Sequence, residues 1–305
     1  MVHLQFLILT PANRGFRALS IQVQSSINDL CPPPAGDFSD LPLTERQRRE
    51  LEYYEEFSRL NFPKEVCFDA VSGNERRPWN PYWFLCESVK SHFHSGEQQL
   101  LDFGCGPGIY SLLFGKVGYQ VSGFDISPSN VEIAHGLATK YDLTDRVNFT
   151  VGAGEHLDYE DEYFDAVVGI DILHHVDIEN ALRECLRVLK PGGLALFKEP
   201  VAVPVFDSLR NSALGRWLVP NGKSLERHIT EDERKLTTKD LKLIQAISSE
   251  ASMKRFRVFS RLDRFNKALA RNGGPSTLEK LDERLLRVLP FLKHFGGDVV
   301  ITLKK

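Results

Sequence analysis

LLDFGCGPG, at residues 100–108, decides the fold, because a short apolar run passes directly into closely spaced glycines. Glycine adopts positive φ angles without steric cost and lets a ligand approach the backbone closely. Residues 109–117 predict a helix, whose first N–H groups would then face that ligand. The order of strand, glycine turn and helix therefore predicts a ligand-binding loop at residues 104–108.

The spacing of the glycines distinguishes this loop from the dinucleotide-binding pattern. That pattern reads G-x-G-x-x-G and places a pyrophosphate at the start of the helix. In this chain Gly104, Gly106 and Gly108 alternate with other residues, and Ile109 follows directly. An NAD(P)-dependent oxidoreductase on a Rossmann fold is the alternative. Both the glycine spacing and the lack of a Tyr-x-x-x-Lys pair disfavour it.

Two acidic residues accompany the glycines. Asp102 lies inside the predicted strand, and Asp125 ends the next one. The second position is where the ribose of a cofactor would lie, and an ionised carboxylate accepts hydrogen bonds from both ribose hydroxyls. The alternative for Asp125 is a helix cap beside Ser127 and Pro128.

Strands and helices alternate on both sides of the glycine loop. Strands are predicted at 100–103, 120–124, 147–151, 164–170 and 194–197, and helices at 109–117, 128–140 and 178–188. A further helix at 238–249 precedes strands at 254–259 and 298–303. This alternation is typical of an α/β fold, a doubly wound parallel sheet covered by helices on both faces.

The first 43 residues differ from the rest. A breaker cluster, Pro32, Pro33, Pro34 and Gly36, predicts a poorly structured tail at 1–43 that cofactor binding does not need. The tail has no acid before Asp29, which resembles an organelle transit peptide. A disordered tail and a misassigned start are the alternatives. We expect one domain at 45–305 and a cytoplasmic protein, with organelle targeting as the alternative.

Helix signals mark the start of the domain. Thr44 and Gln47 have the spacing of a capping box for a helix at 45–60. That helix has one apolar face, formed by Leu51, Tyr54, Phe57 and Leu60. Asn80 and Pro81 read as the cap and first residue of a second helix.

Composition excludes several classes of protein. The 305 residues carry a formal net charge of −3, which gives no reason to expect a nucleic acid partner. The five cysteines form no C-x-x-C pair, so neither a zinc site nor a disulfide framework is predicted. No apolar run reaches the roughly 20 residues of a transmembrane helix. Peripheral membrane contact and the oligomeric state stay open.

Four motifs together resemble a known family. LLDFGCGPG, VSGFDIS, FDAVVGIDILHHV and RVLKPGG are similar to the successive motifs of class I S-adenosylmethionine (SAM)-dependent methyltransferases, of the small-molecule type that includes quinone- and sterol-pathway enzymes. The resemblance covers residues 99–200. It implies a Rossmann-like seven-stranded sheet with an antiparallel last strand, SAM as cofactor, and methyl transfer to a small molecule. A non-catalytic SAM-fold binding protein is a second alternative.

The resemblance also assigns cofactor-binding positions. They are Asp102, Gly104, Cys105, Gly106, Gly108, Asp125, Ile126, Gly154, Glu155 and Asp171. The chain departs from the family at Ala153, where an Asp often accepts a hydrogen bond from the adenine amino group. Adenine recognition is therefore expected from Gly154 and Glu155. The turn at 190–193 is expected to be structural, because Pro191 stops a helix and two glycines follow.

Candidates for a general base are His174, His175, Glu199 and His228. Histidine suits this role because the ordinary pKa of its side chain lies near neutral pH. Glu199 ends the fifth predicted strand, where open α/β sheets bind ligands. The alternatives are packing or backbone hydrogen bonds for the paired histidines, a surface charge for Glu199 and a solvated loop position for His228.

Two predicted cap insertions, 201–236 and 262–294, bear on the methyl acceptor. The first is rich in large apolar residues, which are Phe206, Leu209, Leu214, Trp217, Leu218 and Val219, with Arg216, Lys223, Arg227 and His228 among them. The second has a stripe that we expect to pack on the sheet, formed by Leu278, Leu281, Leu285 and Leu289. An apolar or amphipathic acceptor is therefore expected. Its identity and the methylated atom are not encoded in any motif.

Overall fold

The computed structural model describes residues 43–61, 63, 65–68, 75–94, 96–204, 234–248, 250–265 and 274–305. The predictions for the tail before residue 43 and for most of the first insertion, including His228, lie outside these residues. Within them, no helix is both long and apolar enough to cross a membrane.

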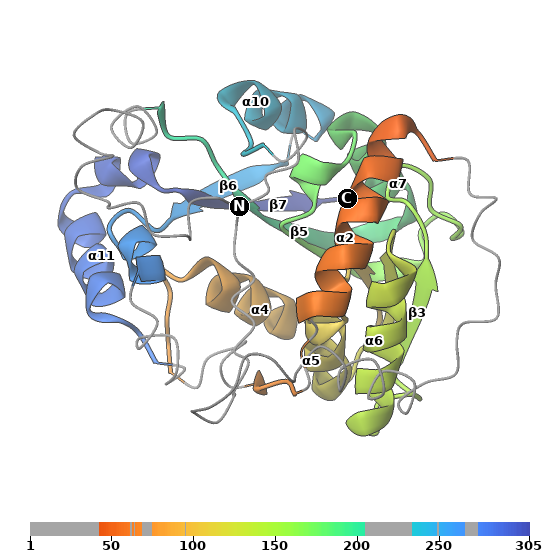
Figure 1. Ribbon diagram of the computed structural model, residues 1–305. Helices are drawn as coiled ribbons and strands as arrows, with labels where there is room; N and C mark the ends of the chain where they lie inside the picture. Colours follow the sequence, from red (N-terminus) through yellow and green to blue (C-terminus); the bar gives the residue numbers. More distant parts are fainter. Residues whose placement is uncertain are drawn as a thin grey trace.

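A seven-stranded sheet forms the centre of the molecule, in the order β3-β2-β1-β4-β5-β7-β6 (Figure 1). Its strands are β1 (Gln99–Phe103), β2 (Gln120–Asp125), β3 (Val147–Val151), β4 (Phe164–Ile170), β5 (Leu189–Pro200), β6 (Ser252–Phe256) and β7 (Asp298–Lys304). Strands β1 to β5 pair in parallel, whereas β7 runs antiparallel to both β5 and β6. The predicted doubly wound sheet with an antiparallel last strand is thereby confirmed.

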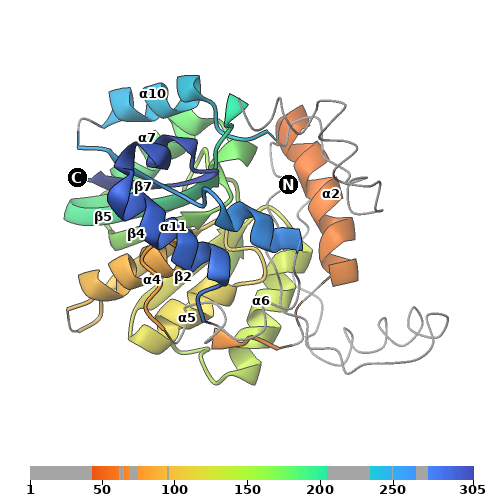
Figure 2. The ribbon, with the colours of Figure 1, turned by 90° about the vertical axis from the view of Figure 1, so that its left-hand side faces the viewer.

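Helices cover both faces of the sheet, as Figure 2 shows with α7 and α10 above it and α4 and α5 below. One core lies under α4 (Pro81–His92), α5 (Ile109–Val117) and α6 (Pro128–Lys140). The other lies under α7 (Ile178–Val188) and α10 (Thr238–Ile247). Successive residues of β1 alternate between them, since Leu100 belongs to the first core and Leu101 to the second. Burial on both faces explains why the strands read as apolar runs.

Helix α2 (Glu45–Asn61) lies outside this sandwich and packs on α6. Its predicted capping box is confirmed: the Thr44 amide donates to Gln47 Oε1 at 2.8 Å, and the Gln47 amide donates to Thr44 Oγ1 at 3.3 Å. Asn80 caps α4 as predicted, because its side-chain oxygen accepts hydrogen bonds from the amides of Tyr82 and Trp83. These caps satisfy N–H groups that a helix start leaves unpaired.

The remaining elements are short or lie near the chain's end. They are η2 (Leu173–His175), η3 (Ser260–Phe265), α11 (Thr277–Val288) and η5 (Pro290–Phe295). The expected packing of the α11 leucine stripe on the sheet is wrong for Leu281 and Leu289, which are both 39% exposed. The helix instead buries Glu279, Asp282 and Leu286.

Two predicted segments have different bounds in the structure. The predicted turn at 190–193 lies within β5 as an irregularity in its pairing with β4, where Gly192 has φ 79°. The strand predicted at 254–259 is β6, two residues earlier, because the chain leaves the sheet after Phe256.

Candidate functional site

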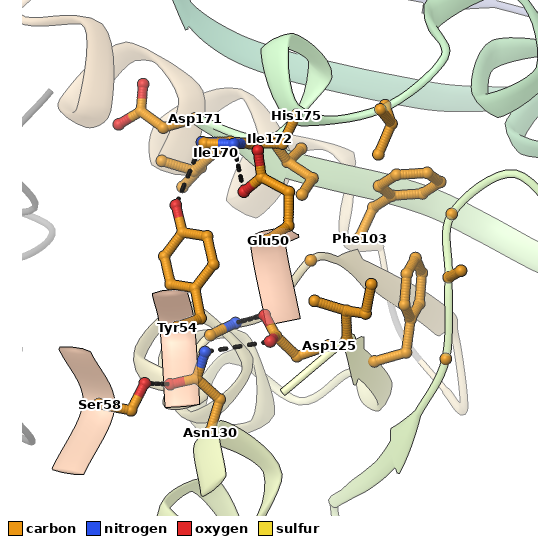
Figure 3. A pocket seen from close by; sticks show the side chains of 18 of the residues that line it. Glu50, Tyr54, Ser58, Phe103, Asp125, Asn130, Ile170, Asp171, Ile172 and His175 are labelled. Carbon is orange, nitrogen blue, oxygen red and sulfur yellow. Dashed lines mark hydrogen bonds and ion pairs between the residues drawn. The ribbon is translucent and has the colours of Figure 1, made fainter. Parts of the chain in front are cut away.

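A pocket opens at the carboxyl ends of β1, β2 and β4 and is closed on its far side by α2 (Figure 3). The chain order of the sheet reverses between β1 and β4, and open α/β sheets bind ligands at such a reversal. The lining residues include Phe103, Gly104, Gly106, Pro107, Phe124, Asp125, Ile126, Asn130, Ile133, Gly152, Ala153, Gly154, Glu155, Ile170, Asp171, Ile172, His174, His175 and Val176. The α2 side chains of the wall are Gln47, Glu50, Tyr53, Tyr54, Phe57 and Ser58.

The glycine loop has the backbone that its sequence predicts. Gly104, Gly106 and Gly108 have φ angles of 71°, 51° and 76°. At Gly106 a Cβ atom would meet nothing within 4 Å, so the backbone there faces open space that a ligand can enter. At Gly108 a Cβ atom would lie 2.8 Å from Ala134 and from Phe149. Gly108 therefore serves packing at the start of α5 and is not part of the pocket wall.

Asp125 lies on the pocket wall and is 9% exposed. Its Oδ2 accepts a hydrogen bond from the Gly106 amide at 2.9 Å, and its Oδ1 accepts from the Ser127 amide and from Asn130 Nδ2 at 2.9 and 3.0 Å. Burial raises the pKa of this carboxyl group, and the three donors oppose that rise. A carboxylate offers about four acceptor positions, so roughly one is left for a ligand hydroxyl.

Asp102 and Cys105 lie behind the glycine loop. Asp102 is 3% exposed and accepts a hydrogen bond from Ser111 Oγ at 2.6 Å. Burial raises its pKa to about 7. Burial also raises the pKa of the Cys105 thiol well above its usual value, which keeps it protonated. Neither side chain lines the pocket, so both shape the loop from below.

Residues 152–155 form a second edge of the pocket. Glu155 lines it, and its Oε1 accepts a hydrogen bond from the Asp177 amide at 3.0 Å. Its Oε2 accepts from Gln47 Nε2 at 2.9 Å, which ties this edge to α2. Ala153 and Gly154 line the pocket beside it.

His174 and Glu199 form a buried pair. Glu199 is fully buried and accepts hydrogen bonds from the amides of Ile172 and Leu173 at 2.8 and 2.7 Å. Its other oxygen lies 2.6 Å from His174 Nδ1. A carboxylate at Nδ1 favours the tautomer whose Nε2 accepts a proton, and His174 is one of the residues that line the pocket. Glu199 is not among the residues that line the pocket, and it contacts His174, which is.

His175 meets two side chains of α2. Its Nε2 lies 3.1 Å from the Tyr54 hydroxyl, and its Nδ1 lies 3.0 Å from Glu50 Oε2, as Figure 3 shows. Glu50 is 4% exposed, and both of its carboxylate oxygens are buried. Glu50 therefore places its charge beside His175 and presents no exposed oxygen to a ligand.

Asp171 borders a buried charge network. Lys198, fully buried, lies 2.7 Å from Asp171 Oδ1 and 3.0 Å from Asp298 Oδ1. Its Nζ also donates to the Tyr82 hydroxyl, which donates in turn to Asp171 Oδ2 at 3.3 Å. Burial alone would lower the pKa of Lys198, but the two carboxylates raise it, so Lys198 stays charged. The network fixes Asp171, whose φ is 57°, at the pocket wall.

Hydrogen bonds fasten α2 to both sides of the pocket. Glu55 accepts from Ser127 Oγ, the Ser129 amide and Ser129 Oγ at the start of α6, at 2.7, 2.9 and 2.5 Å. Ser58 Oγ donates to Asn130 Oδ1 at 2.5 Å. At the other end Arg46 donates to the His174 carbonyl at 2.9 Å. Helix α2 therefore spans the pocket from α6 to η2.

Sequence reasoning missed this wall. The apolar face predicted for α2 contained Tyr54 and Phe57, which do line the pocket, but not Gln47, Glu50 or Ser58. Those three residues recur at three- and eight-residue intervals, so they share a face with Tyr54. That mixed polar and aromatic face was the available signal.

The amino-acid sequence of the chain is similar to those of known methyltransferases. Residues 101–197 match the model of a family described as a methyltransferase domain. The chain is 32% identical over 137 residues to norajmaline N-methyltransferase of Rauvolfia serpentina, a match of 44% of this chain and 45% of that protein. It spans about half the length of the curated relatives that it matches.

Solved structures share the fold. Geranyl diphosphate C-methyltransferase from Streptomyces coelicolor A3(2) superposes with a TM-score of 0.55 at 15% identity, covering 86% of this chain and 99% of that one. The [4+2]-cyclase SpnF superposes with a TM-score of 0.54 at 21% identity, covering 87% and 98%. Residues 101–197 thus match a methyltransferase domain, and the chain as a whole shares the predicted fold with solved methyltransferase structures.

Proposed function

We propose that this protein transfers a methyl group from SAM to a small apolar or amphipathic acceptor. The observation that carries the proposal is one cavity in which the glycine loop and Asp125 face His174 and His175. The glycine loop and Asp125 suit a cofactor with a ribose, and the histidines suit proton removal from an acceptor.

The residues on the first side of the pocket fit SAM. The open backbone at Gly106 leaves room for close approach, and Asp125 keeps about one acceptor position for a ribose hydroxyl. Ile126 and the 152–155 edge would flank the adenine. When bound, SAM supplies a methyl group on a sulfonium, which is open to in-line attack by N, O, S or C. Positioning of donor and acceptor in such a cavity can supply roughly 7–11 kcal/mol.

The residues on the second side can handle a proton. Glu199 holds His174 so that its Nε2 can take a proton from a hydroxyl or amine. The Tyr54 hydroxyl at His175 and the Glu50 carboxylate complete the polar part of the wall. Together they make His174 the first candidate for the general base, with Glu199 as the residue that positions it.

An apolar or amphipathic acceptor is supported by the rest of the wall. Tyr53, Phe57, Phe103, Ile170 and Ile172 present apolar surface to the pocket. The similar proteins are named as N-, O- and C-methyltransferases, so their names do not select the methylated atom.

A second reading keeps the fold without methyl transfer. SpnF, of similar fold, is named as a cyclase, so the fold alone does not fix the reaction. The pocket histidines and the methyltransferase domain match favour transfer, and that match also disfavours the oxidoreductase alternative.

The test has two stages. Calorimetry first compares SAM, S-adenosylhomocysteine and NAD, and we expect binding of the first two only. Labelled SAM is then screened over lipid extracts, nucleosides, RNA and peptides. Turnover in the lipid fraction supports the proposal. Turnover of RNA or peptide alone contradicts the acceptor class, and SAM binding without any turnover favours the non-catalytic reading.

A further inference from the structure

Helix α11 presents basic and apolar side chains on one outward face. Its exposed residues include Lys280, Leu281, Arg284, Arg287 and Val288, at the three- and four-residue intervals of a single helix face. Val288 is 75% exposed. In Figure 2 the helix lies across the side of the molecule that faces the viewer. Among the described residues, the face is therefore exposed at these five positions.

The acidic side chains of α11 are all bound to partners within the protein. Asp282 is fully buried and accepts hydrogen bonds from the amides of residues 258–260 and from Ser260 Oγ. Glu279 is 7% exposed and binds Arg77 and Asn80. Glu283 pairs with Arg287 at 3.0 Å. Because Glu283 neutralises Arg287, the excess positive charge of the outward face comes from Lys280 and Arg284.

The apolar surface continues past the end of the helix. Leu289 and Phe291 are 39% and 58% exposed, and Leu262 on η3, which packs against α11, is 50% exposed. Of the six large hydrophobic residues exposed in the described ranges, five lie between 262 and 291. Lys293 follows on η5, with its Nζ 5.2 Å from the centre of the Trp79 ring. We call this surface, Leu262, Lys280–Leu281, Arg284 and Arg287–Phe291, the α11 face.

Cationic and large apolar side chains on one exposed face favour one kind of partner, an anionic membrane. Helices with cationic and large apolar side chains on their exposed side bind in the plane of an anionic membrane, with apolar groups in the headgroup region and cations at the lipid phosphates. A second copy of the chain would bring the same cations against each other. The whole chain has a formal net charge of −3, so the positive face is a local feature.

We propose that the α11 face docks this protein on anionic phospholipid membranes. In this docking mode α11 would lie in the plane of the headgroup region. It needs neither SAM nor methyl transfer, so it stands apart from the proposed function.

The test is co-sedimentation of the full chain with phosphatidylcholine vesicles, with and without phosphatidylglycerol. We expect binding to the anionic vesicles only, weakened by added salt. Lys280→Glu with Arg284→Glu should weaken it by at least about 25-fold, from roughly fivefold for each cation lost. Val288→Ser with Phe291→Ser should weaken it by about tenfold or more, because these side chains then contribute no apolar contact.

Matched controls lie on other faces. Arg183 on α7 has a side chain that is 65% exposed, and Tyr163 is 41% exposed. Arg183→Glu and Tyr163→Ser should leave vesicle binding unchanged, and unaltered thermal unfolding of every variant shows that the fold is intact. Absence of binding to anionic vesicles overturns the proposal, as does equal weakening by the controls. A concentration-dependent dimer that the α11 variants abolish, without vesicle binding, assigns the face to a second copy and also overturns it.

Discussion

Helices α2 and α11 both carry many charged side chains, but the two helices point them toward different surroundings. Helix α2 points Glu50, Tyr54 and Ser58 into the pocket and uses Glu55 to hold α6. Helix α11 turns its acids, Glu279 and Asp282, into the protein and leaves its cations outside. In α2 the polar groups therefore build a ligand site, whereas in α11 they anchor the helix. The direction of the charged side chains distinguishes the two roles better than apolar periodicity does.

The largest effect is expected on the pocket that α2 closes. His174→Ala should lower the rate of methyl transfer to a hydroxyl or amine acceptor by about 10²–10⁴-fold, because the general base is lost. Single-turnover kinetics measure the rate, and calorimetry should show SAM affinity nearly unchanged.

Glu199→Gln is the companion variant, since its amide can donate to His174 Nδ1 and so disfavour the reactive tautomer. A similar fall in rate is expected for it. Full activity of both variants would remove His174 from the mechanism.

The anchoring role of α11 predicts a loss of stability. Asp282→Ala leaves three amides, two of them buried, and the Ser260 hydroxyl without their acceptor, so the free energy of unfolding should fall by about 3 kcal/mol or more. Urea unfolding measures it. Glu283→Ala, which removes a partly exposed ion pair, should cost less than about 1 kcal/mol. Equal costs for the two would contradict the distinction between them.

A smaller effect is expected at the contact between α2 and η2. Tyr54→Phe removes the hydroxyl at His175 Nε2 but keeps the ring, so SAM binding should weaken by about 0.5–1.5 kcal/mol. Calorimetry on Tyr54→Phe and on the distant Tyr163→Phe separates the contact from a general effect of losing a hydroxyl. A wild-type affinity in Tyr54→Phe would mean that this hydrogen bond does not support the closed pocket.

The sequence was informative where one local pattern determines the structure. The glycines, the strand before them and Asp125 all lie between residues 99 and 125, and their arrangement follows from the preferred geometry of a strand, a turn and a helix. Strand β7 was predictable from its β-branched residues, such as Val299, Val300 and Ile301.

The α2 wall and the α11 face depend on distant partners. The Tyr54 contact joins residues 121 positions apart, and Glu279 binds Arg77 across 202 positions. Periodicity shows which side chains share a helix face but not what that face meets. For this reason the leucine stripe of α11 was expected on the sheet, although buried acids hold the helix instead. The buried Lys198 was missed because its compensating carboxylates, Asp171 and Asp298, also come from other strands or their ends.

The central claim is that Asp125 and the glycine loop form a SAM site, and calorimetry tests it most directly. Wild-type protein should bind SAM and not NAD. Asp125→Ala should weaken SAM binding by about 10- to 150-fold, which corresponds to roughly 1.5–3 kcal/mol for one hydrogen bond to a charged group. Asp125→Asn, which keeps an acceptor for the Ser127 amide and Asn130 but sets its NH2 group against the Gly106 amide, should weaken SAM binding less than Asp125→Ala. Unchanged SAM affinity in a folded Asp125→Ala variant would contradict the account.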